Sequence, residues 1–525
     1  MMQYMKRFAN KLFGRLTLGV LIICLQFGWL VYMVYHATAA NSAVNIVFEL
    51  IAVILSLHVA NKEMRTSYKV SWIFLILCLP IFGIPAYFLF GRSEVTKRVR
   101  RKMEEVAGQF TPLRTEDAST KESLYQENFY AGKQSTYITD YAGYPLYRED
   151  TTKYYSSGEA LFPQFLEDLN SAEHFIFLEY FIIEPGKMFD AVLEILERKA
   201  KEGVLVRLIY DDVGCITTLP SKYYRTLQEK GIHCACFNPF RPMLSVIMNN
   251  RDHRKIAVVD NRIAYTGGFN LADEYINAKE RFGYWKDAGI RMTGTCVWSF
   301  TTMFLEMWAY ITKQKEDCEP YRIGTDGEAL ADSVSQATEQ AKNTGYIQPY
   351  SDSPMDKEYV GENVYLNMIA HAKSYVYIFT PYLILGSEMS TALINAAKCG
   401  VDVRIVVPGI PDKKLVYLLT QSDFVPLIDG GVKIYKYTPG FLHSKCFVVD
   451  DVYAAVGTIN LDYRSLCLHF ECGTFMYRTQ AVMEVKEDVL QTIEQSRQVT
   501  AQEAKNRRFI MRQFFSVLKL LSPLL

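Results

Sequence analysis

The segment HRKIAVVDNRIAYTGGFN at residues 253–270 recurs in altered form as HSKCFVVDDVYAAVGTIN at residues 443–460. Five residue types keep their spacing, and each returns 190 residues later. They are His253, Lys255, Asp260, Gly267 and Asn270 in the first copy, and His443, Lys445, Asp450, Gly457 and Asn460 in the second. A repeat of this length predicts two structurally similar lobes.

Alternating strand-like and helix-like patterns precede both copies of the segment. Before the first we expect helices at 158–172, 190–202 and 221–230, and strands at 174–183, 204–210 and 232–237. Before the second we expect helices at 358–373, 388–398 and 413–429, and strands at 374–380, 401–407 and 432–437. Strands that alternate with helices indicate an α/β architecture. The chain is therefore predicted to contain a duplicated α/β/α domain with mixed sheets.

Each copy brings together groups that suit a phosphodiester. Residues two apart on a strand share a face, so His253 and Lys255 are expected to point the same way, as are His443 and Lys445. Asn270 and Asn460 should return beside them as amide donors that bind phosphate. Imidazole serves as nucleophile or general acid, while lysine and asparagine hold the charge on the non-bridging oxygens. Two copies would supply one imidazole on each side of a single phosphorus atom, a reaction that needs neither a metal ion nor a cofactor.

Some of these residues have a second interpretation. Asp260 and Asp450 are candidate members of the catalytic set, but they can equally be structural, orienting the lysine or the turn. A catalytic histidine usually has a carboxylate on its other ring nitrogen. We expect Glu471 to play this part for His443 and Asp287 for His253, with ordinary ion pairs as the alternative.

Composition narrows the range of functions. Lys+Arg and Asp+Glu both number 57, so there is no basic excess of the kind that predicts nucleic-acid binding. The 11 cysteines show no Cys-x-x-Cys spacing, which disfavours a zinc site. Their scatter fits reduced thiols and a cytoplasmic catalytic domain.

The two ends of the chain suggest contact with a lipid bilayer. Apolar stretches at 16–35, 43–60 and 70–91 predict N-terminal transmembrane helices, with buried helices of a soluble domain as the alternative. Pro80, Gly83 and Pro85 interrupt the third stretch, which is compatible with a re-entrant segment as well as with a full span. Basic and apolar residues alternate at 501–525, as in helices that lie on an anionic membrane or pack on a domain. These patterns predict a multi-pass protein of the plasma membrane.

The predicted domain organisation follows from these motifs and from the changes in composition along the chain. It comprises a membrane region at 1–91, a connector at 92–145, a first lobe at 146–315, a polar linker at 316–354, a second lobe at 355–500 and a basic amphipathic segment at 501–525.

Both copies match the signature of the phospholipase D superfamily: HxK, four residues, D, six residues, then G-x-x-N. NNRDHRK at 249–255, GFLHSK at 440–445 and GTINLDYRS at 457–465 resemble its cardiolipin synthase branch more narrowly. LILG at 383–386 departs from that branch, as does the third apolar stretch. The resemblance implies two phospholipase D-like lobes that transfer a phosphatidyl group between two phosphatidylglycerol molecules, with His253 as nucleophile and His443 as acid and base.

Three other functions remain open at this level. The same histidines could activate water, as in a phospholipase D, or an alcohol other than phosphatidylglycerol. A nuclease of the same fold is disfavoured by the apolar stretches and the neutral charge. A catalytically inactive membrane scaffold is disfavoured because lysine and asparagine are retained in both copies.

Overall fold

The computed structural model describes residues 42–91, 97–148, 151–240, 249–323, 345–506 and 509–524, with short helical pieces between 21 and 36. The chain divides into two compact units. Unit 1 comprises Met1–Arg100, Asn238–Asn250 and Arg508–Leu525, and unit 2 comprises Arg101–Phe237 and Arg251–Arg507. Both copies of the repeated segment lie in unit 2.

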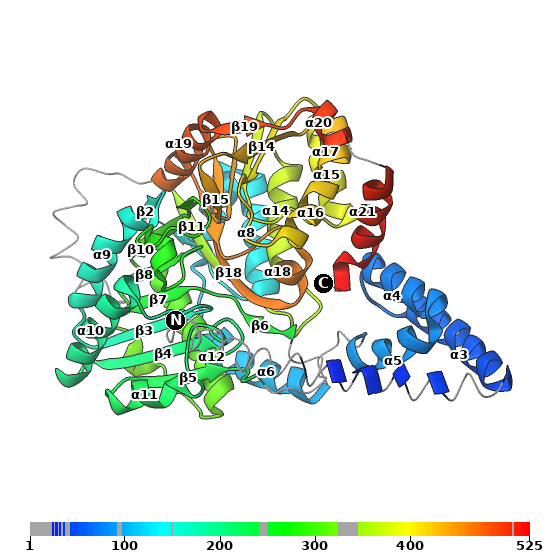
Figure 1. The fold of residues 1–525 in the computed structure, drawn as a ribbon. Helices are drawn as coiled ribbons and strands as arrows, with labels where there is room; N and C mark the ends of the chain where they lie inside the picture. Colours follow the sequence, from blue (N-terminus) through cyan, green and yellow to red (C-terminus); the bar gives the residue numbers. More distant parts are fainter. Residues whose placement is uncertain are drawn as a thin grey trace, which may run out of the picture. The chain divides into compact units, whose positions relative to one another are not determined.

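The first copy belongs to a seven-stranded mixed sheet in the order β2-β10-β8-β7-β3-β4-β5 (Figure 1). β3, β4 and β5 run parallel, and the other neighbours are antiparallel. The strands are β2 (Thr151–Tyr155), β3 (Phe175–Tyr180), β4 (Leu205–Asp211), β5 (His233–Phe237), β7 (Ile256–Val259), β8 (Ile263–Gly267) and β10 (Gly289–Thr293).

The second copy belongs to a ten-stranded sheet in the order β1-β11-β18-β17-β16-β12-β13-β14-β19, with β6 paired to β18 outside this path. The strands are β1 (Tyr147–Arg148), β6 (Arg251–Asp252), β11 (Tyr346–Asp352), β12 (Tyr375–Phe379), β13 (Asp402–Pro408), β14 (Lys433–Tyr437), β16 (Cys446–Val449), β17 (Tyr453–Gly457), β18 (His469–Tyr477) and β19 (Ser496–Gln498). From β18 to β14 the order repeats that of the first sheet from β10 to β5. The predicted duplication of a mixed-sheet α/β domain is therefore confirmed.

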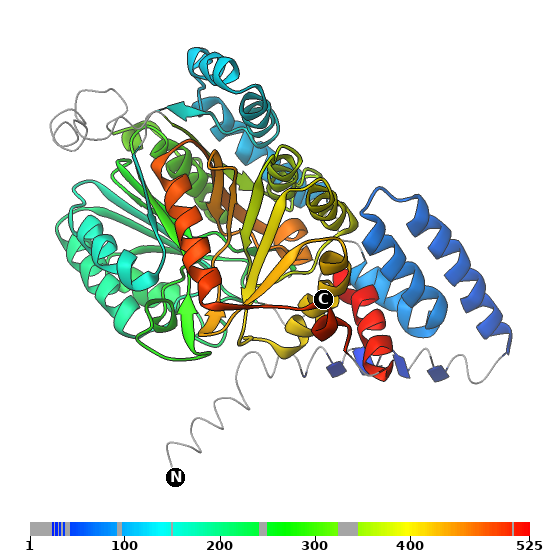
Figure 2. The same ribbon diagram turned by 90° about the horizontal axis from the view of Figure 1, so that it is seen from above.

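Helices cover both faces of each sheet because side chains alternate along the buried strands. In β3, Ile176 packs into the core shared with α9 (Gly158–Asn170) and α10 (Lys187–Lys201). The ring of Phe177 instead stacks on Phe304 of α12 (Val297–Thr312), with centroids 4.6 Å apart. In β16, Phe447 stacks on Tyr365 of α14 (Val360–Ala370). Cys446 faces Tyr154, which bonds Asp488 of α19 (Gln480–Glu494). Figure 2 shows α19, in orange-red, lying over both the green strands and the yellow-orange strands.

Several predicted elements differ in detail. The predicted helix at 413–429 is two helices, α16 (Lys414–Ser422) and α17 (Phe424–Asp429). Pro426, which has no N–H to continue a helical ladder, lies just after the break. The end of the predicted linker, residues 346–352, forms β11 within the second sheet. Tyr147 and Arg148 of the predicted first lobe also pair with β11.

Seven further α-helices among the described residues lie before, within or after the two lobes. They are α6 (Lys97–Phe110), α7 (Ala118–Glu127), α8 (Phe129–Tyr137), α11 (Tyr223–Glu229), α15 (Ser387–Lys398), α18 (Tyr463–Cys467) and α20 (Ala501–Lys505).

Unit 1 contains α3 (Ser42–Asn61), α4 (Thr66–Cys78), α5 (Pro80–Phe90) and α21 (Phe509–Leu521). The third apolar stretch is broken at Leu79, where φ is −136° and Pro80 begins the next helix. Within the part of the chain that the structure describes, no helix combines the length and apolar character that crossing a bilayer requires, so the predicted transmembrane helices are not found there. Most of the first apolar stretch lies outside the described residues. The amphipathic C-terminal segment forms α21, and Ser71 of α4 donates a hydrogen bond to the carbonyl of Leu520.

Candidate active site

Each catalytic histidine candidate lies just before a buried strand, in a short irregular segment. β7 begins at Ile256 and β16 at Cys446, so the histidine and lysine precede the strands that were expected to contain them. The lysine ammonium folds back on this segment. Lys255 Nζ donates to the carbonyl of His253 at 2.6 Å, and Lys445 Nζ donates to the carbonyl of His443. Each lysine therefore contacts the backbone carbonyl of its histidine, in the same way in both lobes.

Asp260 and Asp450 have the structural role. The Asp260 carboxylate accepts hydrogen bonds from the backbone N–H groups of Glu173, His174 and Phe175, at 2.6–2.8 Å. Asp450 accepts from the corresponding groups at the start of β12, those of Lys373, Ser374 and Tyr375. Both aspartates have positive φ, 51° and 55°, as does the residue after each, which is the turn of a tight hairpin. They connect the hairpin to the neighbouring strand, so the candidate catalytic role gives way to its alternative.

The lobes exchange short segments at their junction. β15 (Gly440–Leu442) of the second lobe pairs with β9 (Tyr284–Lys286) of the first. His443 follows directly, and its N–H donates to the carbonyl of Lys286 at 2.7 Å. In the reciprocal contact β6 pairs with β18, and the N–H of His253 donates to the carbonyl of Phe470 at 3.0 Å. Each histidine is thus attached by its backbone to the opposite lobe.

This exchange reverses the carboxylate pairing that the sequence suggested. Nδ1 of His253 lies 2.9 and 3.0 Å from the two oxygens of Glu471, and Nδ1 of His443 lies 2.7 Å from Asp287 Oδ2. The pairing of Glu471 with His443 and of Asp287 with His253 was therefore wrong. Glu471 lies within β18 of the second lobe and Asp287 directly after β9 of the first, while the histidine that each carboxylate contacts belongs to the other lobe. Sequence proximity could not reveal this exchange.

The two carboxylates are held by different donors. Glu471 accepts from the hydroxyls of Thr458 and Ser465. Asp287 accepts from the indole N–H of Trp285 at 3.3 Å and from the N–H of Ala288 at 2.9 Å.

Thr458, Ser465 and Trp285 were not predicted as site residues. For Ser465 a signal existed, because the D-x-x-S pattern at 462–465 predicts a helix N-cap, and Asp462 does accept from the N–H of Ser465.

Glycines make room for this arrangement. A Cβ at Gly267 would lie 2.5 Å from the carbonyl oxygen of Ala288, and one at Gly457 would lie 2.3 Å from that of Cys472. At Gly268 a Cβ would lie 1.8 Å from Asp287 Oδ1. The second lobe has Thr458 at this position, and its hydroxyl binds the carboxylate. The close approach of strand and carboxylate therefore explains the glycines of the repeat.

The electrostatics of the site favour neutral imidazoles. Burial, followed by the charges of Lys255, Lys445 and His443, lowers the pKa of His253 well below its ordinary value. Burial and the charge of Lys445 also lower the pKa of His443, but the Asp287 carboxylate opposes them and the value is about 4. Because each Nδ1 faces a carboxylate, it carries the ring proton, and Nε2 keeps the lone pair.

The same crowding affects the lysines. Burial lowers the pKa of Lys255 to about 8 and that of Lys445 to about 7. Charges of both lobes act on each of these groups, so the two copies form one electrostatic site. An anionic phosphodiester would relieve the repulsion between the cations.

The two predicted phosphate-binding asparagines differ. The Asn270 amide is engaged at both ends, since Oδ1 accepts from the N–H of Ile182 and Nδ2 donates to the hydroxyl of Tyr275. Asn460 Oδ1 is buried and has no hydrogen-bond partner among the described residues.

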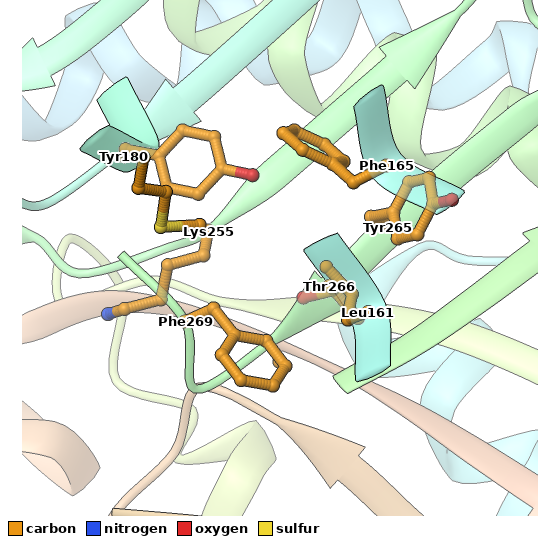
Figure 3. A pocket seen from close by; sticks show the side chains of 9 residues that line it. Leu161, Phe165, Tyr180, Lys255, Tyr265, Thr266 and Phe269 are labelled. Atoms are coloured by element: carbon orange, nitrogen blue, oxygen red, sulfur yellow. The ribbon is translucent and has the colours of Figure 1, made fainter. Parts of the chain in front are cut away.

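A narrow cavity adjoins Lys255 in the first lobe (Figure 3). Its volume is about 20 Å³, which is room for about one water molecule. The hydrocarbon stem of Lys255 runs along the cavity, while its ammonium points away from the rings of Phe165 and Tyr265. Apolar packing on one side and a carbonyl on the other thus fix the direction of the ammonium.

These groups can bind and cleave a phosphodiester. Two imidazoles with fixed tautomers supply a nucleophile and a proton carrier, and two buried ammonium groups hold the anion. His469 adds a third imidazole beside His253 and Glu471, and these three are also the residues here that could hold a metal ion.

Known proteins are similar to this one over most of the chain. The family described as "Cardiolipin synthase, PLD-like domain" matches residues 165–283 and 365–493, and "Phospholipase_D-nuclease N-terminal" matches residues 50–92. A protein of Streptococcus mutans is 42% identical over 475 residues, 89% of this chain and 99% of its own. The cardiolipin synthase of Alkalihalophilus pseudofirmus is 32% identical over 483 residues, 92% of this chain and 93% of its own. Cardiolipin synthase 2 of Bacillus anthracis is 33% identical over 88% of each chain.

Among solved structures, phosphatidylserine synthase of Haemophilus influenzae matches the fold with a TM-score of 0.56 at 15% identity, covering 75% of this chain and 99% of its own. The fold, the repeated motifs and the relatives agree, and the chain belongs to the cardiolipin synthase family of phospholipase D-like proteins.

Proposed function

We propose that this phosphatidyltransferase joins two molecules of phosphatidylglycerol into cardiolipin and releases glycerol. The observation that carries the proposal is the reciprocal pairing of His253 with Glu471 and of His443 with Asp287 across the lobe junction. Each imidazole is buried and oriented by a carboxylate, beside a lysine that can hold a phosphate. The relatives named cardiolipin synthase support the choice of lipid substrate.

The reaction proceeds in two transfers at one phosphorus atom. Nε2 of His253 attacks the phosphorus of the first phosphatidylglycerol, and a P–N bond forms as the P–O bond to glycerol breaks. His443 takes up a second proton, on Nε2, once the anionic phosphodiester has raised its pKa, and it gives that proton to the departing glycerol oxygen. A hydroxyl of the second phosphatidylglycerol then gives its proton to His443 and attacks the phosphorus, which releases His253.

The assignment of nucleophile and acid follows the resemblance to phospholipase D-like proteins, in which the first-motif histidine is often the nucleophile. At His443 the Asp287 carboxylate opposes the lowering of the pKa by burial and by Lys445. The anionic charge of the bound phosphodiester raises the pKa of His443 further and prepares it as the acid. Mass spectrometry of enzyme quenched during turnover should find the phosphatidyl group on His253, and modification of His443 instead would reverse the roles.

Lipid analysis tests the function itself. Purified enzyme given phosphatidylglycerol alone should form cardiolipin and glycerol in equal amounts. His253→Ala and His443→Ala should abolish both products. Phosphatidate without cardiolipin would identify a hydrolase that uses water, and the proposal would then fail.

We further propose that residues 1–91 attach the enzyme to the plasma membrane, with its catalytic part on the cytoplasmic face. Large apolar side chains are exposed along α3, and a patch of this kind is typical of a surface that contacts lipid. They are Ile46, Val47, Leu50, Val53, Ile54 and Leu57. Flotation of a 101–525 fragment with lipid vesicles, compared with the full chain, would test this attachment.

A further inference from the structure

We propose that His253, His469 and Glu471 form an inhibitory site for a transition-metal cation of the Zn²⁺ type. Its existence is independent of the proposed function, and only the consequence for turnover rests on that function. The site is built from one residue of the first lobe, His253, and two residues that share a face of β18, His469 and Glu471.

The three side chains have the spacing of a metal site. Each offers a ligand atom, and these atoms all lie within 4.8 Å of one another. Glu471 is the common neighbour, 2.9 Å from Nδ1 of His253 and 3.8 Å from Nδ1 of His469. The two imidazole rings are 5.5 Å apart between centroids. A cation bound between them needs only small side-chain adjustments to reach the usual Zn–N and Zn–O distances of about 2.0–2.2 Å.

His469 has no hydrogen-bond partner for either ring nitrogen among the described residues, although both atoms are buried. Its side chain is 11% exposed, and the Glu471 oxygen at 3.8 Å is too far for a hydrogen bond. A buried polar group without a partner destabilises a fold, so such a group in a native protein indicates a ligand or an ion that satisfies it. A cation at Nδ1 would do so.

The first lobe lacks this feature at the equivalent position. Gly289 pairs with Gly267 and Gly473 pairs with Gly457, so Trp285 occupies the place in the first lobe that His469 occupies in the second. Trp285 donates its indole N–H to Asp287 and has no lone pair for a metal. The duplicated fold thus produces a three-ligand site in one half only.

The ligand set selects the class of cation. Two imidazoles and a carboxylate suit Zn²⁺ or Co²⁺, whereas Mg²⁺ and Ca²⁺ prefer oxygen ligands. The hydroxyls of Thr458 and Ser465 already orient the Glu471 carboxylate, as outer ligands do in metal sites. Lys255 and Lys445 repel a cation, which argues for reversible rather than permanent occupancy.

Metal binding would stop catalysis through the tautomer of His253. Coordination uses the Nδ1 lone pair, so the ring proton that Nδ1 donates to Glu471 must move to Nε2. Nε2 then has no lone pair with which to attack phosphorus. The proton stays on the ring, and the nucleophile is lost until the cation leaves.

Binding can be measured without turnover. Full-length enzyme in detergent, titrated with Co²⁺, should show visible absorption of a low-coordinate nitrogen and oxygen site, with one equivalent bound and displaced by Zn²⁺. His469→Gln should weaken binding at least tenfold, and the exposed His233→Gln should leave it unchanged. If His469→Gln lowers the unfolding temperature, His469→Asn replaces it. Equal Co²⁺ affinity in the wild type and the His469 variants would overturn the proposal.

Inhibition is a second readout. In wild type and in His233→Gln, the ratio of activity with Zn²⁺ to activity without it should fall below one and return to one on chelation. In His469→Gln this ratio should stay near one. Mg²⁺ should have no such effect. Because each variant is compared with itself, a change in its basal rate does not affect this ratio. Co²⁺ binding with no cardiolipin formed would reject the proposed function but keep the site, whereas inhibition that is equally strong in His469→Gln would place Zn²⁺ elsewhere.

Discussion

Gly268 lies against the carboxylate that orients His443, and this contact leaves no room for a side chain. A Cβ there would lie 1.8 Å from Asp287 Oδ1, so Gly268→Ala must displace the carboxylate. We expect kcat to fall about 10–100-fold, the usual effect of losing a group that orients a catalytic ligand. Gly108→Ala is the matched control, because no atom lies within 4 Å of a Cβ at that position. Equal kcat in the two variants would contradict the steric argument.

The tautomer of each imidazole shows separately which carboxylate it contacts. In Glu471→Gln the tautomer of His253 should change while that of His443 stays as in the wild type, because Asp287 holds His443. Asp287→Asn should do the opposite. Nitrogen-15 NMR of histidine-labelled enzyme reports both rings, and kcat should fall about 10–100-fold in either variant. A change at His443 in Glu471→Gln would restore the pairing suggested by the sequence.

At the scale of elements, a buried ion pair joins β9, the first-lobe strand at the lobe junction, to α19. Lys286 Nζ lies 2.7 Å from Asp488 Oδ2 of α19, and each side chain is 8% exposed. Tyr154 donates to the same carboxylate at 2.6 Å. Lys286→Met leaves Asp488 buried without its cation and should lower the free energy of unfolding by about 3–5 kcal/mol. Chemical unfolding in detergent measures this loss.

The matched double variant separates the charge from the packing. Lys286→Met combined with Asp488→Leu removes both charges and should recover most of the stability, since apolar pairs replace buried ion pairs at little cost. If the double variant is as unstable as Lys286→Met, packing rather than charge fastens β9.

The strands and helices of the lobes could be predicted because their periodicity is local. The expected strand at 401–407 is observed at Asp402–Pro408, and the expected helix at 388–398 is observed at Ser387–Lys398. The pairing of Glu471 with His253 was not predictable in this way, because it joins residues 218 positions apart across an exchange of segments. Local pattern likewise gave no signal for His469, whose significance depends on a neighbour from the other lobe. The spacing of residue types in the sequence thus predicts the strands and helices. The contacts within the site depend on how those elements assemble, which local spacing does not show.

For the whole molecule, duplication has produced two halves that share a backbone but differ in chemistry. Glu179 of the first lobe, paired with Ile256, corresponds to Phe379 of the second, paired with Cys446. Glu179 forms a buried ion pair with Arg254 at 2.6 Å, a contact that the second lobe lacks at the equivalent positions, Phe379 and Ser444. Differences of this kind give two similar histidines different surroundings. A ping-pong reaction uses the two rings differently, because one attacks the phosphorus while the other carries the proton.

The charges of both lobes together should set the pH dependence. The first transfer needs an unprotonated His253 to attack, a protonated His443 to act as the acid, and protonated lysines to hold the phosphodiester, which stays anionic throughout this range. The pKa of His443 is about 4 and that of Lys445 about 7. We therefore expect kcat/KM to fall gradually as the pH rises above about 4, and to fall more steeply on a second, basic limb above about pH 7. In Lys445→Arg the guanidinium stays charged, so the basic limb should move toward the pKa of Lys255, about 8. Initial rates in mixed micelles from pH 4 to 9 measure both limbs, and a basic limb that is the same in Lys445→Arg and wild type would show that this limb belongs to another group.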